Sequence, residues 1–213
     1  MSERSGPDPV VWIVDDDEAM RSSLKWLIES VGMPVESHDS ANSFLRSHYP
    51  GRFGCLLLDV RMPGMSGLEL LEHLDEQQML PPTIIITGHG DVPMAVRAMK
   101  SGAVDFIEKP FNDEVLLDAI RRALATEEYR RDYSAGVAGV AERLSNLTPR
   151  EHEVMHMVTD GMSNKEIANS LGVSAKTVEA HRARVMEKMQ AGSLAELVRM
   201  AISVEQNGAG LQK

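Results

Sequence analysis

Short apolar runs alternate with amphipathic segments along residues 9–125. Each run is short, often β-branched, and followed by a turn or a carboxylate, as is typical of strands buried in a parallel sheet. The runs are Val10–Val14, Cys55–Leu58, Thr83–Thr87 and Val104–Ile107, with a weaker one at Pro34–His38. We therefore predict five strands in this half of the chain.

The segments between these runs carry a helical pattern. Met20, Leu24, Leu27, Ile28 and Val31 recur at spacings of three and four, which predicts an amphipathic helix. Similar patterns cover Gly67–Leu74, Pro93–Lys100 and Asp113–Ala125. Strands that alternate with helices indicate an α/β domain, in which a doubly wound parallel sheet carries helices on both faces.

The strand pattern stops after residue 125. Residues 126–146 read as a linker, with helix as an open alternative for part of it. Residues 147–204 show only helical signals, so we expect an all-α domain of four helices. Three helix starts have a cap residue followed three positions later by glutamate, and a fourth has a lone cap residue. The cap residues are Thr148, Ser163, Ser193 and, without the glutamate, Ser174.

Two of the predicted helices form a specific arrangement. The run SNKEIANSLGVSAKTVEAHRARVM contains a short helix, a turn with Gly172, and a longer helix over Ser174–Met189. This order is that of a helix-turn-helix motif, whose second helix enters the major groove of DNA. Val178, Val185 and Met189 would face the core. A solvated surface is the alternative for an arbitrary basic helix, but the turn favours DNA binding.

Charge is distributed unevenly along the chain. The net charge of −10 by itself argues against nucleic-acid binding. Residues 1–125, however, contain 11 basic and 20 acidic side chains, whereas residues 143–213 contain 9 and 8. The C-terminal part can therefore approach DNA if its basic side chains share one face.

Hydropathy and cysteine content indicate the cellular compartment of the protein. No apolar stretch approaches the ~18 residues that span a bilayer, and the first nine residues lack the apolar segment of a signal peptide. The single cysteine, Cys55, lies in an apolar run and is expected to be a buried thiol. We expect a cytoplasmic protein with no membrane partner.

Polar side chains gather where the predicted strands end. Because parallel strands place their carboxyl ends on one edge of a sheet, these side chains can share one pocket. They are Asp15, Asp16, Asp17, Asp59, Thr87 and Lys109. An acidic turn alone is often only a solvated loop or a helix cap, but four strand ends together favour a site.

This pocket has the chemistry for accepting a phosphoryl group. Clustered carboxylates favour a hard divalent cation, Mg²⁺ or Mn²⁺. Asp59 could then attack phosphorus and form an acyl phosphate, while Lys109 and Thr87 hold the phosphoryl oxygens. Gly88 would leave space beside the site.

The segments VDDDE, LLLDVRMPGMSGLELL, IIITGHGD and AVDFIEKPF resemble the receiver domain of two-component response regulators, especially the FixJ/NarL group, over residues 9–125. The resemblance implies a flavodoxin-like fold and a sensor histidine kinase as partner. It implies Asp59 as phosphoacceptor, and Asp16, Asp59 and the Arg61 carbonyl as metal ligands, with Asp15 acting through water.

The same resemblance implies how phosphorylation of the site changes the rest of the receiver. Thr87 and the aromatic Phe106 would act as the switch, and the face over residues 91–106 would change shape and form a homodimer on phosphorylation. The bond between Lys109 and Pro110 is expected to be cis. The chain would slowly hydrolyse its own aspartyl phosphate and would not be a turnover enzyme.

Residues 147–204 closely resemble the LuxR-type DNA-binding domain. This implies promoter DNA as a partner, with RNA polymerase as a further candidate, and pairing of two output domains through the last helix, Ser193–Ser203. Candidate DNA contacts are Lys165, Lys176, Thr177, Glu179, Ala180, His181, Arg182, Ala183 and Arg184. None of the groove-facing residues Glu179, Ala180 and Ala183 is a strong reader of purines, so no operator follows.

Two other function classes fit parts of the sequence. Asp15–Asp17 has the D-x-D spacing of haloacid-dehalogenase-like phosphatases, but Ala19 stands where those enzymes usually have Thr or Val. The second alternative is a module that sequesters a partner without using DNA. The capping boxes and the basic helix argue against it, and salt-dependent binding to duplex DNA would separate such a module from a DNA-binding regulator.

Overall fold

The computed structural model describes residues 9–47, 52–88 and 91–208. Residues 1–8, which bear on the signal-peptide prediction, lie outside this part. The chain divides into two compact units, Met1–Tyr129 and Arg130–Lys213, and each is described by itself. In the described ranges, no helix combines the length and the hydropathy that a membrane span requires.

The first unit contains one parallel sheet of five strands in the order β2-β1-β3-β4-β5. All five predicted strands are present, and each observed boundary lies within one residue of the predicted one. The strands are β1 (Val10–Val14), β2 (Val35–His38), β3 (Gly54–Asp59), β4 (Thr83–Thr87) and β5 (Asp105–Glu108).

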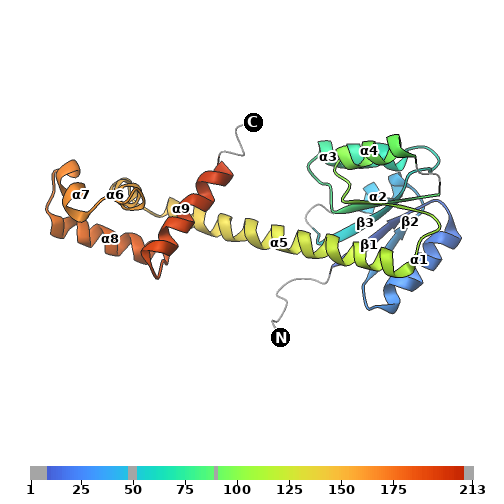
Figure 1. Cartoon of the computed structure of the whole chain (residues 1–213), viewed down its shortest axis with the longest axis horizontal. Coiled ribbons are helices and arrows are strands. Elements are labelled where there is room, and N and C mark those ends of the chain that lie inside the picture. Colours follow the sequence, from blue (N-terminus) through green and yellow to red (C-terminus); the bar gives the residue numbers. More distant parts are fainter. Residues whose placement is uncertain (1–8, 48–51, 89–90, 209–213) are drawn as a thin grey trace. The chain divides into compact units, whose positions relative to one another are not determined.

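Helices cover both faces of the sheet, so the doubly wound fold is confirmed (Figure 1). On one face, α1 (Glu18–Ser30) and α5 (Asp113–Ser145) pack against Val11 and Ile13 of β1. On the other, α2 (Ala41–Ser47), α3 (Gly67–Glu76) and α4 (Val92–Lys100) pack against Trp12. Because both faces are covered, successive residues of the central strands β1, β3 and β4 are all buried.

Helix α2 was missed by the sequence analysis. It has seven residues, and only Ala41 and Phe44 are buried. A helix of two turns that buries two side chains gives too few repeats for a 3.6-residue period to be recognised. Its clearest signal is Ser40, whose hydroxyl accepts a hydrogen bond from the Ser43 amide at 3.3 Å.

Helix α5 does not end at residue 125 but continues to Ser145, through the segment predicted as a linker. Its last turns belong to the core of the second unit. Val140 is 7% exposed, and Leu144 packs against the same cluster as Leu147. Burial therefore stabilises a helix end that contains two glycines and shows little periodicity of its own.

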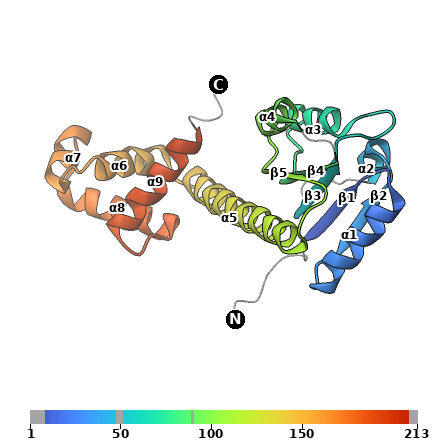
Figure 2. The same cartoon turned by 45° about the vertical axis from the view of Figure 1, so that its right-hand side comes forward.

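The second unit contains the four helices that were predicted, and α8 contacts both α6 and α7 while α9 packs on α6 (Figure 2). They are α6 (Pro149–Thr159), α7 (Asn164–Leu171), α8 (Ala175–Met189) and α9 (Leu194–Gly208). Val178, Val185 and Met189 are fully buried, as predicted.

Two of the three predicted capping boxes are present, at Thr148 with Glu151 and at Ser163 with Glu166. The third differs. Glu196 accepts a hydrogen bond from the amide of Gly192 at 2.8 Å rather than from Ser193, although the Ser193 hydroxyl still accepts from the Glu196 amide at 3.2 Å.

The burial of Val140 leads to a stability prediction. We expect Val140→Ala to lower the free energy of unfolding of the second unit by about 2 kcal/mol, since two buried methyl groups are lost and a cavity remains. Hydrogen exchange of the α6 and α8 amides measures this. Val115→Ala is the control because Val115 is 53% exposed on the same helix. Equal exchange in both variants would contradict the assignment of Val140 to this core.

Candidate functional site

The predicted pocket residues lie at adjacent strand ends on one edge of the sheet. Asp15 directly follows β1, Asp59 is the last residue of β3, Thr87 is the last of β4, and Lys109 directly follows β5. These four strands are neighbours in the sheet. The order of the strands therefore brings together residues that are up to 94 positions apart in the chain.

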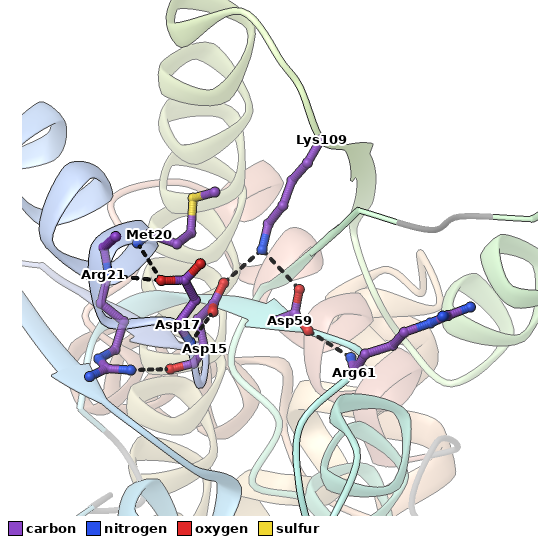
Figure 3. Close-up of polar contacts among 8 residues, drawn as sticks. Asp15, Asp17, Met20, Arg21, Asp59, Arg61 and Lys109 are labelled. Atoms are coloured by element: carbon purple, nitrogen blue, oxygen red, sulfur yellow. Dashed lines mark hydrogen bonds and ion pairs between the residues drawn. The ribbon is translucent and has the colours of Figure 1, made fainter.

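Lys109 joins two buried carboxylates (Figure 3). Its Nζ donates to Asp15 Oδ2 at 2.7 Å and to Asp59 Oδ1 at 2.9 Å. Asp15 is 3% exposed and Asp59 7% exposed. One ammonium cannot neutralise two carboxylates, so this edge of the sheet retains negative charge.

Burial and ion pairing shift the pKa of Asp59, and likewise that of Lys109, in opposite directions. Burial raises the pKa of Asp59 above its ordinary value, against the lowering effect of Lys109. Burial disfavours the charged form of Lys109, but its hydrogen bonds to Asp15 and Asp59 outweigh this and raise its pKa. Lys109 is thus a permanent cation beside a carboxylate whose charge is poorly compensated.

A set of hydrogen bonds fixes the loop that follows β1. The Asp15 amide donates to the carbonyl of His38 at 3.2 Å, and Arg21 Nη1 donates to the Asp15 carbonyl at 2.8 Å. Asp17 caps α1, and its own amide donates to Asp15 Oδ1 at 2.9 Å. Asp17 thus has a structural partner, consistent with its omission from the predicted metal ligands. The sequence analysis did not identify Arg21, whose only signal is its place in the first turn of α1.

Asp16 is arranged differently. Its side chain is exposed, and no hydrogen bond or ion pair to it is formed within the described residues. Asp15 and Asp59 point toward Lys109, whereas Asp16 remains available to a ligand from solvent.

The second oxygen of Asp59 is also occupied, because Oδ2 accepts a hydrogen bond from the Arg61 amide at 2.6 Å. The loop after β3 turns back sharply, and a Cβ at Gly67 would overlap the Asp59 carbonyl oxygen. Glycine is therefore required at the start of α3 for the chain to pass this close to Asp59.

The predicted switch residues occupy different environments. Thr87 is 1% exposed, while Phe106 is partly buried against the core on the α2, α3 and α4 face. A Cβ at Gly88 would meet no atom of the described residues within 4 Å, so there is open space at this position. The peptide bond between Lys109 and Pro110 is cis, as the resemblance implied.

The donor set suits a hard divalent cation. Carboxylate and carbonyl oxygens are the ligands that Mg²⁺ prefers, and the negative charge left at Asp15 and Asp59 favours a further cation. Among the described residues, no three His, Cys, Asp or Glu side chains are gathered in a metal-binding cluster. The set that the resemblance implies has two direct carboxylate ligands, Asp16 and Asp59, with the Arg61 carbonyl, and Asp15 acts through water.

Most candidate DNA contacts are exposed on the helix-turn-helix. Lys165 lies near the start of α7, and the others lie on α8. The exposed ones are Lys165, Lys176, Thr177, Glu179, Ala180, Ala183 and Arg184. Thr177 also contacts the Ser174 hydroxyl at 2.8 Å, within the cap of α8.

Two candidates are partly buried. Arg182 Nη1 donates to Asn164 Oδ1 at 2.7 Å, so its guanidinium already has a partner on α7. His181 Nδ1 is buried without a hydrogen-bond partner in the described part of the chain. The sequence analysis did not single out Asn164, which appeared only as the residue after a helix cap.

Two family models match the chain. The response regulator receiver domain matches residues 11–121, and the LuxR family of bacterial regulatory proteins matches residues 145–201. Together these matches cover the sheet with its acidic pocket and the helix-turn-helix.

Curated relatives match nearly the whole chain. The transcriptional regulatory protein FixJ of Bradyrhizobium diazoefficiens is 49% identical, over 90% of this chain and 94% of its own length. FixJ of Rhizobium meliloti is also 49% identical, over 92% and 96%. The response regulator protein TodT of Pseudomonas putida is 44% identical, over 94% and 87%.

Solved structures agree with this assignment. The response regulator StyR superposes with a TM-score of 0.83 at 44% identity, covering 92% of this chain and 98% of its own. Full-length FixJ from B. japonicum superposes with a TM-score of 0.58 at 47% identity, covering 93% and 98%. The chain therefore belongs to the two-component response regulators of the FixJ/NarL group, with a receiver domain followed by a LuxR-type DNA-binding domain, and it is a transcriptional regulator rather than a turnover enzyme.

Proposed function

We propose that phosphorylation of Asp59 by a sensor histidine kinase switches this regulator into a form that binds promoter DNA. The observation that carries the proposal is the contact of Lys109 with both Asp15 and Asp59, which places a cation beside a buried nucleophile. In the transfer, one oxygen of Asp59 attacks phosphorus, the bond to the kinase histidine breaks, and an acyl phosphate forms.

The residues of the pocket have distinct roles in this proposal. Lys109 holds a phosphoryl oxygen by a charge-assisted hydrogen bond, and Thr87 donates its hydroxyl to another. Mg²⁺, or Mn²⁺, would be held by Asp16, Asp59 and the Arg61 carbonyl, with Asp15 reaching it through water. When bound, the ion stabilises the charge that develops on the phosphoryl group.

The signal leaves the pocket through Thr87 and Phe106. A new dianion at Asp59 draws Thr87 toward it, and Phe106 turns into the space released. Helix α4, which lies between Thr87 and Phe106 in the chain, exposes apolar side chains that a second receiver would cover in a homodimer. They are Val92, 77% exposed, Val96, 46% exposed, and Met99, 49% exposed.

The output is DNA binding by α8 in the major groove. Lys165, Lys176 and Arg184 provide exposed charge for phosphates, and Glu179, Ala180 and Ala183 face base edges. Leu194 and Ile202 of α9 are 46% and 45% exposed, which suits the pairing of two output domains. RNA polymerase is a further partner, and the cytoplasm is the compartment in which these partners meet.

The proposed division of the chain is 9–125 for the receiver, 126–146 for a helical linker and 147–204 for the output domain. Val140, which lies in the proposed linker, is buried in the core of the second unit, and this supports a structural role of the linker for the output domain.

Sedimentation velocity and DNA titration with beryllofluoride test the proposal. Beryllofluoride with Mg²⁺ replaces the phosphoryl group at an aspartate. We expect the full chain to shift from monomer to dimer and to bind duplex DNA about 5- to 150-fold more tightly, the usual range of coupling between two sites. A chain that binds no duplex in either state would contradict the proposed output. A shift that persists in Asp59→Asn would contradict the proposed acceptor.

A further inference from the structure

The two helices of the helix-turn-helix are joined by a hydrogen bond between side chains. Asn164 is the first residue of α7, and its Oδ1 accepts from Arg182 Nη1 of α8 at 2.7 Å. Arg182 lies between the buried and exposed faces of α8. Val178 and Val185, four residues before and three after it, are fully buried, whereas Ala183 is exposed.

The partner of Arg182 is neutral, as is that of Arg143, which donates to Gln190 Oε1 at 3.2 Å, whereas two other cations of the second unit pair with carboxylates. Arg150 pairs with Glu153 at 2.8 Å, and Lys188 pairs with Glu151 at 2.7 Å. A carboxylate partner cancels the charge that a phosphate would recognise, but an amide oxygen does not. Arg182 therefore keeps its full positive charge while its position is fixed.

The hydrogen bond also leaves most of the guanidinium available. Arginine has five N–H donors, and Asn164 takes one of them. A free arginine loses rotamer entropy when it is ordered, so a side chain already held in place loses less on binding. Lys165, the residue after Asn164, is exposed and adds a second charge at the same end of α7.

We propose that Asn164 is a positioning residue for DNA binding, which holds the charged guanidinium of Arg182 at the edge of α8 for a backbone phosphate. This inference rests on the proposed DNA-binding function. It assigns Asn164 no contact with DNA of its own. The competing role is a tether that only stabilises the packing of α7 on α8.

A double-mutant cycle in the full chain tests this inference. The proteins are the wild type, Asn164→Ala, Arg182→Met and the double variant, each with Mg²⁺ and beryllofluoride. The probe is a fluorescent duplex of mixed sequence of about 30 base pairs, long enough for two half-sites one helical turn apart. Anisotropy gives the affinity over a series of salt concentrations. The control is Asn169→Ala, which removes an exposed amide from another side of α7.

We expect Arg182→Met to weaken binding about 10-fold and to lower the slope of log affinity against log salt by about 0.9, the value for one phosphate contact. Asn164→Ala should weaken binding about 3- to 10-fold in the wild-type background and less than about 2-fold in the Arg182→Met background. Its salt slope should lie between those of the wild type and Arg182→Met. Asn169→Ala should bind as the wild type does.

Several outcomes would overturn the inference. An equal loss in both backgrounds would mean that Asn164 contacts DNA directly. An unchanged affinity in Asn164→Ala would mean that Arg182 needs no positioning. A loss that follows faster hydrogen exchange in α7 would indicate the tether. A wild-type chain that binds no duplex would refute the proposed function itself, whereas binding that is insensitive to Asn164 refutes only this inference.

Discussion

Asp59→Asn is expected to abolish the gain of a phosphoryl group while the receiver stays folded. The amide cannot attack phosphorus, and it is nearly isosteric with the carboxylate. One hydrogen bond is lost, because the side chain now has a single acceptor for the Lys109 ammonium and the Arg61 amide. The repulsion between Asp15 and Asp59 is lost as well, and burial already disfavours the charge of Asp59, so we expect the free energy of unfolding to hold or rise.

Intact mass spectrometry of the full chain with Mg²⁺ and a small phosphodonor measures this result. Asp17→Asn is the matched control, because Asp17 lies in the same acidic loop and caps α1, a role that asparagine fills equally well. The control should gain one acid-stable but base-labile group at the wild-type rate. Phosphorylation of Asp59→Asn at that rate would show that another carboxylate is the acceptor.

Glu151→Gln is expected to destabilise the second unit by about 1–3 kcal/mol. Glu151 is 3% exposed and accepts hydrogen bonds from Lys188 Nζ at 2.7 Å and from the Thr148 amide at 2.9 Å. These bonds, that of Lys188 foremost, lower the pKa of Glu151 to about 2. Glutamine can still cap α6, but it leaves the Lys188 ammonium without a counter-charge.

The same contact predicts a dependence on pH. Since the folded pKa of Glu151 lies below its ordinary value of 4.5, its contribution is complete above pH 4.5 and is lost as the pH falls toward about 2. The difference in stability between the wild type and Glu151→Gln should therefore shrink over this window. Urea denaturation at each pH, monitored by hydrogen exchange of the α6 amides, measures this difference in stability.

Glu166→Gln provides the control for Glu151→Gln. Glu166 occupies the same place in the capping box of α7, and its hydrogen bonds to Ser163 lower its pKa, but no lysine reaches it in the described structure. Its replacement should change stability little. A similar loss in both variants would assign the effect to the capping box rather than to Lys188.

The receiver illustrates which elements a sequence specifies by itself. Strands such as Val10–Val14 are buried on both faces, so every residue is apolar and the run stands out from its surroundings. Helix α2 buries only Ala41 and Phe44, so its sequence carries little more than a cap at Ser40. The strength of the sequence signal thus follows the number of side chains that an element buries.

Helix ends also differ in how well the sequence by itself predicts them. The caps at Thr148 and Ser163 are local, because both partners lie within four residues, and the sequence predicted them correctly. The end of α5 is not local. It depends on the burial of Val140 in a core built by residues far along the chain, so periodicity alone placed the end of this helix at residue 125.

In the acidic pocket, the sequence determined the residue types and their positions at the strand ends, because a strand's carboxyl end can be read from where its apolar run stops. The partners of these residues were decided only by the tertiary structure. Lys109 contacts Asp15 and Asp59, Arg21 holds the Asp15 carbonyl, and Asn164 holds Arg182. The contacts of Lys109 join strand ends that are distant in the chain, and the other two join neighbouring elements. A hydrogen bond requires two atoms at about 3 Å in a suitable direction, which follows from the packing of whole helices and strands rather than from local pattern.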